Sequence, residues 1–83
     1  MTIEHLIQEL QTRVCKMLVL RPDAISAQSD LGICGLDSIK TVLLVVELEE
    51  NYNINFAEQD LFFEHFNTIE KLAKLVFSKL MLM

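Results

Sequence analysis

Apolar residues recur at steps of three and four in two segments, one near each end of the chain. The first segment, from about Thr2 to Leu20, contains Ile3, Leu6, Ile7, Leu10, Val14, Met17 and Leu18 in this pattern. The second begins near Asn67 and contains Ile69, Leu72, Ala73, Val76 and Leu80. Such spacing places side chains on one face of an α-helix. One proline and two glycines also argue against a turn-rich β fold. We therefore expect an all-α chain.

Stop and capping residues mark the ends of the predicted helices. The first helix should stop at Arg21-Pro22, because the residue before a proline is pushed out of the α region. A second helix is predicted to start at Asp37-Ser38, with Asp37 as its N-cap. It should end between Asn51 and Asn53, where asparagine can take the left-handed conformation that helix ends often need.

The remaining segments complete a small helical bundle. Residues 22–37 form a long connection, which in so small a domain is usually packed and functional. A short helical turn is predicted for Glu58 to Glu64, and Asn67 with Glu70 resembles the capping box that opens a helix. The expected apolar anchors of the long connection are Ile25, Leu31, Ile33 and Leu36. The expected core aromatics that close the bundle are Phe62, Phe63 and Phe66. We predict an all-α four-helix bundle, three long helices and a short third one, in a single domain spanning residues 1–83.

Composition excludes several functions. A net charge of −5 argues against nucleic acid as a partner, because phosphate binding needs a basic face, and favours basic patches on other proteins. The longest uninterrupted apolar run, Val42 to Val46, is too short to insert into a membrane, and no signal peptide is evident. Cys15 and Cys34 match no metal site or disulfide framework and are expected to be reduced thiols. We expect a cytoplasmic monomer without a metal ion.

The second helix has apolar residues nearly all round its axis, so a small bundle cannot bury all of them. We assign one stripe to the core, with Leu44 beside it: Val42, Val45, Leu48 and Tyr52. We assign a second stripe, Ile39, Leu43 and Val46, to the surface, where an exposed apolar stripe usually marks a docking face. The alternative is that both stripes are buried.

Ser38 lies at the start of this helix, after the long connection. Free amides and the helix dipole favour a negative group there, so a phosphodiester on its hydroxyl would be stabilised. Serine is also common in first helical turns, and the position alone leaves both interpretations open.

The surrounding residues resemble a known signature. Leu31-x-x-Cys34-Gly35-Leu36-Asp37-Ser38-Ile39 is similar to the Leu-Gly-x-Asp-Ser-Leu motif of acyl and peptidyl carrier proteins. The stretch from Val46 to Ile54, which contains Leu-Glu-Glu and Tyr52, resembles the block that follows in that family. The resemblance covers almost the whole chain. It implies that Ser38 carries 4′-phosphopantetheine, with Asp37 capping the helix beside it.

Some positions depart from the family pattern. Cys34 and Ile39 stand where leucine is usual, which are small changes. Lys40 and Leu43 stand where carriers resembling those of fatty-acid synthesis are typically acidic. These two residues favour a dedicated pathway: polyketide, nonribosomal-peptide or specialised lipid synthesis.

The resemblance implies a carrier without catalytic activity of its own. It would hold acyl or aminoacyl groups as thioesters and present them to other enzymes. Its partners would be a phosphopantetheinyl transferase and the ligases, synthases or transferases that load and use the cargo. The expected partner-binding residues are Ile39, Lys40, Leu43, Val46, Glu47 and Glu50. The three phenylalanines could also line a pocket for the acyl chain.

Two rival functions use Ser38 differently. In a small helical protein–protein interaction domain without a prosthetic group, Ser38 would be only a helix-start residue. A hydrolase would need a base near Ser38. His5 and His65 are expected to be exposed or capping residues, and no Gly-x-Ser-x-Gly elbow surrounds Ser38.

Overall fold

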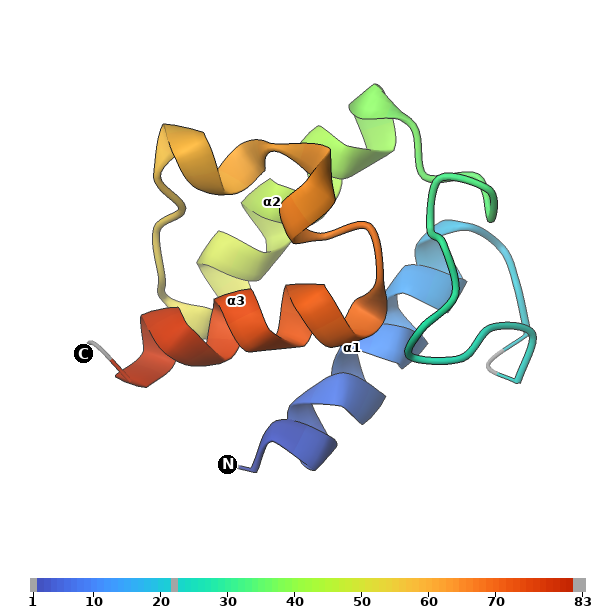
Figure 1. Ribbon diagram of the computed structural model, residues 1–83, viewed down its shortest axis with the longest axis horizontal. Coiled ribbons are helices and arrows are strands. Elements are labelled where there is room, and N and C mark those ends of the chain that lie inside the picture. The colour runs from blue at the N-terminus through green and yellow to red at the C-terminus, as the bar shows by residue number, and fades with distance from the viewer. Residues whose placement is uncertain (1, 22, 82–83) are drawn as a thin grey trace.

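The computed structural model of the chain describes residues 2–21 and 23–81. Its three α-helices are α1 (Ile3–Met17), α2 (Ser38–Tyr52) and α3 (Ile69–Met81) (Figure 1). Two 3-10 turns, η1 (Glu58–Leu61) and η2 (Phe63–His65), connect α2 to α3. The described residues form no strand. The all-α prediction is confirmed, and the predicted short third helix takes the form of these two turns.

The predicted stripes of the first and last helices form most of the core. The buried residues of α1 are Leu6, Leu10, Val14 and Cys15, and those of α3 are Ile69, Leu72, Ala73 and Val76. Other stripe residues, such as Ile7 and Leu80, are partly buried against this core. Burial of apolar surface of this kind is the main force that holds a small bundle together.

The end of α1 differs from the prediction. The helix ends at Met17, three residues before Leu20, and Val19 has a left-handed conformation with φ of 57°. The amide of Leu20 donates to the carbonyl of Cys15 at 2.8 Å, which closes the helix end as left-handed terminations do. The helix therefore ends before the predicted Arg21-Pro22 stop is reached, and Pro22 lies outside the described residues.

The connection between α1 and α2 is held by three of its four predicted anchors. Ile25, Leu31 and Leu36 are buried, whereas Ile33 is exposed, so its assignment was wrong. The amides of Gly32 and Ile33 both donate to the Asp30 carboxylate, and the tight turn that results turns Ile33 outward. The chain needs glycine at position 35, where φ is +115°.

The start of α3 also differs from the prediction. The hydroxyl of Thr68, and not the side chain of Asn67, accepts a hydrogen bond from the Lys71 amide, at 3.1 Å. Glu70 is not part of a capping box, because its carboxylate accepts a hydrogen bond from Gln28 at 2.8 Å. Asn67 contributes through its carbonyl, which accepts from the Leu31 amide at 2.8 Å and ties the long connection to α3.

The faces of α2 are only partly as predicted. The predicted surface stripe of Ile39, Leu43 and Val46 is exposed. The core side is centred on Leu44 and Leu48, each 1% exposed, whereas Val42 is 62% exposed and does not belong to the core. Val45 and Tyr52 are half-buried. Val42 is uncovered because the segment facing it consists of two 3-10 turns and leaves a groove beside α2.

Two of the three predicted core aromatics are exposed. Phe66 is buried, but Phe62 is 61% exposed and Phe63 is partly exposed. A 3-10 helix has three residues per turn, so Phe63 and Phe66 share a side, while Phe62 faces elsewhere. The rings of Phe63 and Phe66 meet edge to face, with centroids 5.7 Å apart.

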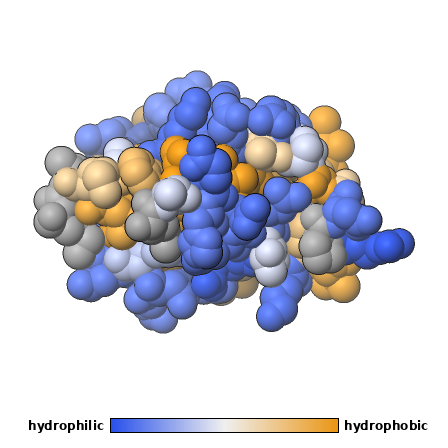
Figure 2. Space-filling view, turned by 90° about the horizontal axis from the view of Figure 1, so that it is seen from below, coloured by the Kyte–Doolittle hydropathy of each residue, from blue (hydrophilic) through white to orange (hydrophobic). Residues whose placement is uncertain are grey.

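The outside of the molecule is mostly polar on the side viewed in Figure 2, with smaller hydrophobic areas between the charged residues. Over the ranges 2–21 and 23–81, no helix has the length and apolar character needed to cross a bilayer.

Leu43 and Leu44 are adjacent and identical in type, and they test the orientation of α2. Leu44→Ala should lower the free energy of unfolding by about 2–5 kcal/mol, because it leaves a cavity in the core. Leu43→Ala should lower it by less than about 1 kcal/mol, because this side chain is 56% exposed. Urea unfolding of both variants measures the difference. Equal losses would show that α2 is rotated from the orientation described.

Candidate functional site

Ser38 is the first residue of α2 and is exposed. Asp37 provides the N-cap: its carboxylate accepts a hydrogen bond from the Lys40 amide at 2.8 Å. The Asp37 carbonyl accepts from the amide and the hydroxyl of Thr41, at 2.9 and 2.7 Å. Asp37 therefore performs the capping that a serine at a helix start could otherwise perform. Within residues 2–21 and 23–81 the hydroxyl of Ser38 has no hydrogen-bond partner, so it is available for modification.

The start of α2 is electrostatically suited to a phosphate group. The amides of Ser38 and Ile39 have no acceptor within the described part of the chain. They point out of the first turn of a 15-residue helix, where the dipole is positive. A phosphodiester on the Ser38 oxygen would lie beside these amides, so the residues present fit such a group.

An apolar groove with a volume of about 590 Å³ begins beside Ser38 and runs between α2 and the 3-10 turns. Its α2 side is lined by Val42, Val45 and Val46, and its other side by Leu61, Phe63 and Phe66. Gly32 lies in its lining, where an added Cβ would come within 3.1 Å of the Phe63 ring. The polar side chains that line it are Asp37, Ser38 and Thr41, all at the start of α2. The groove can hold a hydrocarbon chain, but it offers few hydrogen-bond partners to a polar chain.

The outer wall of this groove is fixed by polar contacts. The Asp60 carboxylate pairs with Lys79 of α3 at 2.6 Å and accepts from the Ala57 amide at 2.8 Å. The hydrogen bond from Lys79 holds the pKa of Asp60 below its usual range. The amide of Phe56 donates to the Glu49 carboxylate at 2.9 Å, which ties the segment before η1 to α2.

The predicted partner-binding residues fall into two groups. Ile39 and Leu43 form a shallow hollow with Ser38 and Val42. Lys40 lies on the same half of α2, partly exposed. Glu47 lies apart from this group, because its carboxylate pairs with Arg13 of α1.

The other two predicted partner-binding residues, Val46 and Glu50, complete the comparison with the sequence prediction. Val46 is exposed and also lines the apolar groove, and Glu50 is exposed near the end of α2. Sequence reasoning missed Gly32, Leu61 and Val42 as groove residues. Apolar residues all round the second helix were a signal for Val42, but nothing in the sequence marked Gly32.

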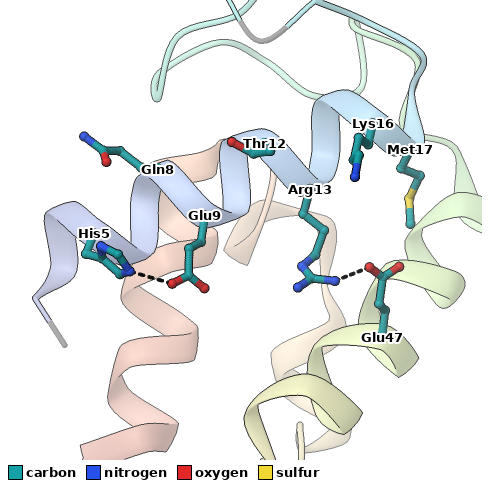
Figure 3. Close-up of a pocket in the computed structure, with 8 residues that line it drawn as sticks. All are labelled: His5, Gln8, Glu9, Thr12, Arg13, Lys16, Met17 and Glu47. Carbon is teal, nitrogen blue, oxygen red and sulfur yellow. Dashed lines mark hydrogen bonds and ion pairs between the residues drawn. The ribbon is translucent and has the colours of Figure 1, made fainter.

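A second groove, of about 660 Å³, is lined mainly by residues with polar side chains and is called the polar groove below; it shares no residue with the first. All its lining residues except Glu47 belong to α1 (Figure 3). His5 pairs with Glu9 at 2.7 Å, and the Tyr52 hydroxyl donates to the same carboxylate at 2.7 Å. The Tyr52–Glu9 hydrogen bond and the Arg13–Glu47 pair join α1 to α2, whereas the His5–Glu9 pair lies within α1. We assign this groove a structural role.

Neither histidine in the described part of the chain is placed to act as a base on Ser38. His5 lies in the polar groove, and His65 lies near the Phe62 ring, with centroids 6.4 Å apart. Neither histidine lines the groove beside Ser38. Within residues 2–21 and 23–81, no three His, Cys, Asp or Glu side chains are placed to hold a metal ion. Cys15 is buried and Cys34 is partly buried, and the two are not joined by a disulfide.

Comparison with known proteins identifies the family of the chain. The family model described as "Phosphopantetheine attachment site" matches residues 8–76, and the chain belongs to that family. The chain is also similar to "Acyl carrier protein 4, chloroplastic" of Arabidopsis thaliana, with 34% identity over 71 residues. That alignment covers 84% of the chain and 50% of the relative, so the chain spans about half the relative's length. In this family 4′-phosphopantetheine is attached covalently to the protein at that site.

Tyr52 allows the contact between α1 and α2 to be measured. Burial and the hydrogen bond to Glu9 raise its pKa from 10.0 to about 12. The stability that this contact supplies should be complete below pH 10 and decline as the pH rises from 10 toward 12. Tyr52 is the only tyrosine and the chain has no tryptophan, so tyrosinate absorbance reports on it alone.

The control uses two glutamates of α1. Glu9→Gln should bring the pKa of Tyr52 back toward its ordinary value, because it removes the charged acceptor. Glu4→Gln, an equal change at an exposed residue of the same helix, should leave the titration as it was. If Tyr52 titrates near its ordinary pKa in the unchanged protein, the contact with Glu9 does not form in solution.

Proposed function

We propose that this chain is an acyl carrier protein whose 4′-phosphopantetheine arm is attached to Ser38. One observation carries the proposal: an exposed serine with a free hydroxyl starts α2, and an apolar groove begins beside it. Asp37 supports the assignment, because its capping bond fixes the first turn and keeps Ser38 at the surface. The arm supplies a thiol that holds the cargo as a reactive thioester.

The lining of the groove favours an acyl cargo over an aminoacyl one. Apart from the three residues at the start of α2, the side chains along it are hydrocarbon or aromatic. An alkyl chain that enters the groove removes apolar surface from water, which is favourable. The ammonium group of an aminoacyl cargo would be buried there without a partner, which is costly. A chain held in the groove would also be shielded from water between encounters with enzymes.

The carrier role implies enzymes that load the cargo and enzymes that use it. Attachment to one protein gives each of these enzymes a high effective concentration of the cargo. Lys40 and Leu43 replace expected acidic residues, which favours a dedicated pathway. Of the expected types, we propose polyketide or specialised lipid synthesis, because these use an acyl cargo. A cytoplasmic monomer is part of the same proposal, although the Arabidopsis relative is by its name chloroplastic.

The attachment site is tested by incubating the protein with coenzyme A and a broad-specificity phosphopantetheinyl transferase. Intact mass spectrometry should show one added phosphopantetheinyl group on the unchanged protein and none on Ser38→Ala. Ser29→Ala is the matched control: Ser29 lies in the long connection, bonded to the amide of Ser26, and its replacement should leave loading complete.

Two results would contradict the proposal. Equal loading of Ser38→Ala would move the attachment site to another residue. A folded protein that gains no mass with any transferase would support the rival function, an interaction domain without a prosthetic group.

A further inference from the structure

Two of the three acidic residues in the second half of α2 use their carboxylates in contacts within the protein. The Glu47 carboxylate pairs with Arg13, and the Glu49 carboxylate accepts from the Phe56 amide at 2.9 Å. Glu50 remains exposed, but it lies twelve residues beyond Ser38, about 18 Å along a helix. Charges already paired within a protein offer little to an approaching basic surface.

The surface of α2 next to Ser38 is apolar apart from two charged groups, the capping carboxylate of Asp37 and the ammonium group of Lys40. From Ser38 to Val46 the sequence has no acidic residue and one basic residue, Lys40. Ile39, Val42 and Leu43 are exposed there and form the hollow beside Ser38. No carboxylate in the ranges 2–21 and 23–81 pairs with the Lys40 ammonium group.

The enzyme that loads Ser38 has to cover this surface. In the transfer, the Ser38 oxygen bonds to the β-phosphorus of coenzyme A and the pyrophosphate P–O bond breaks. Adenosine 3′,5′-bisphosphate leaves, and the hydroxyl proton passes to a base of the transferase. The attacking oxygen must lie within bonding reach of the coenzyme, so the transferase contacts the residues around it.

We infer that the phosphopantetheinyl transferase of this carrier binds it through an apolar surface with a carboxylate facing Lys40, and not through a basic patch. The inference rests on the proposed attachment at Ser38. The transferase surface should complement the carrier surface that it covers. It should place apolar side chains against Ile39, Val42 and Leu43. It should place a carboxylate against the ammonium group of Lys40.

This mode of recognition has a distinct salt dependence. Attraction between opposite charged patches weakens as salt rises, whereas burial of apolar surface does not. Loading should therefore be nearly as efficient in high salt as in low salt. Binding of the Ser38→Ala protein to the transferase should show a negative heat-capacity change, the mark of apolar burial.

The test uses two transferases as probes, one with a basic carrier-binding surface and one with an apolar surface. With coenzyme A as donor, kcat/KM is measured by intact mass at roughly 0.05 and 0.5 M salt. The apolar-surface enzyme should be at least about tenfold more efficient, a difference of about 1.4 kcal/mol. Calorimetry with the Ser38→Ala protein supplies the heat-capacity change.

Three variants make the test specific. Leu43→Glu should lower kcat/KM with the apolar-surface enzyme by at least about tenfold, because an unpaired charge is buried at the contact. Lys40→Glu should lower it as well and raise loading by the basic-surface enzyme. Lys71→Glu, an equal change of charge at an exposed residue of α3, should alter neither rate. Circular dichroism checks that each variant is folded.

The outcomes separate the two proposals. No mass gain with either enzyme overturns attachment at Ser38 and with it this inference. Loading at Ser38 that is fastest with the basic-surface enzyme and is slowed by salt overturns the inference alone. Loading by the apolar-surface enzyme that survives high salt and fails in Leu43→Glu supports it.

Discussion

The hydrogen bond from the Lys40 amide to the Asp37 carboxylate decides where α2 begins. Because Asp37 is the cap, Ser38 is the first helical residue and its hydroxyl takes no part in the helix. The loop before it is held in place by buried Leu31 and Leu36, and the Leu31 amide is bonded to the Asn67 carbonyl. One capped helix start on an anchored loop thus presents a reactive oxygen, a positive dipole end and two free amides together.

α2 uses its two halves differently. In the second half, Glu47 and Tyr52 contact α1, and Glu49 contacts the segment before η1. Polar side chains there stabilise the packing of α2 within the protein. In the first half, Val42 and Leu43 are exposed beside Ser38. Soluble proteins rarely leave a contiguous apolar area uncovered without a use for it. In this carrier we connect the area to two occupants: the acyl chain along the groove, and the enzymes that approach Ser38.

The sequence was sufficient for the presence of the three α-helices, the Asp37 cap and the exposed stripe of α2, because local spacing and capping chemistry determine them. It was not sufficient for the end of α1 or the cap of α3. The core side of α2 was predicted less well: Val42 was assigned to the core, while Leu44 was placed only beside it. Periodicity locates apolar faces but cannot tell which face a neighbour covers, and here the neighbour is a pair of 3-10 turns. The same limit explains why Phe62, which was predicted to be a core aromatic, is exposed. The pairing of Glu47 with Arg13 joins residues 34 positions apart, and no local pattern reports it.

Nuclear magnetic resonance of the loaded protein tests the central claim most directly. The protein is labelled with nitrogen-15, and two loaded forms are prepared, one with an octanoyl group and one with a glycyl group on the arm. The amide chemical shifts of each form are compared with those of the protein with an unloaded arm. With the octanoyl group, amide shifts should change at Ser38 and Ile39 and along the groove at Val42, Val45 and Phe63. With the glycyl group, the changes should stay at the start of α2. The α1 amides that border the polar groove should not respond to either. Shifts centred on α1, or identical shifts for the two cargoes, would contradict an acyl carrier that holds its chain beside Ser38.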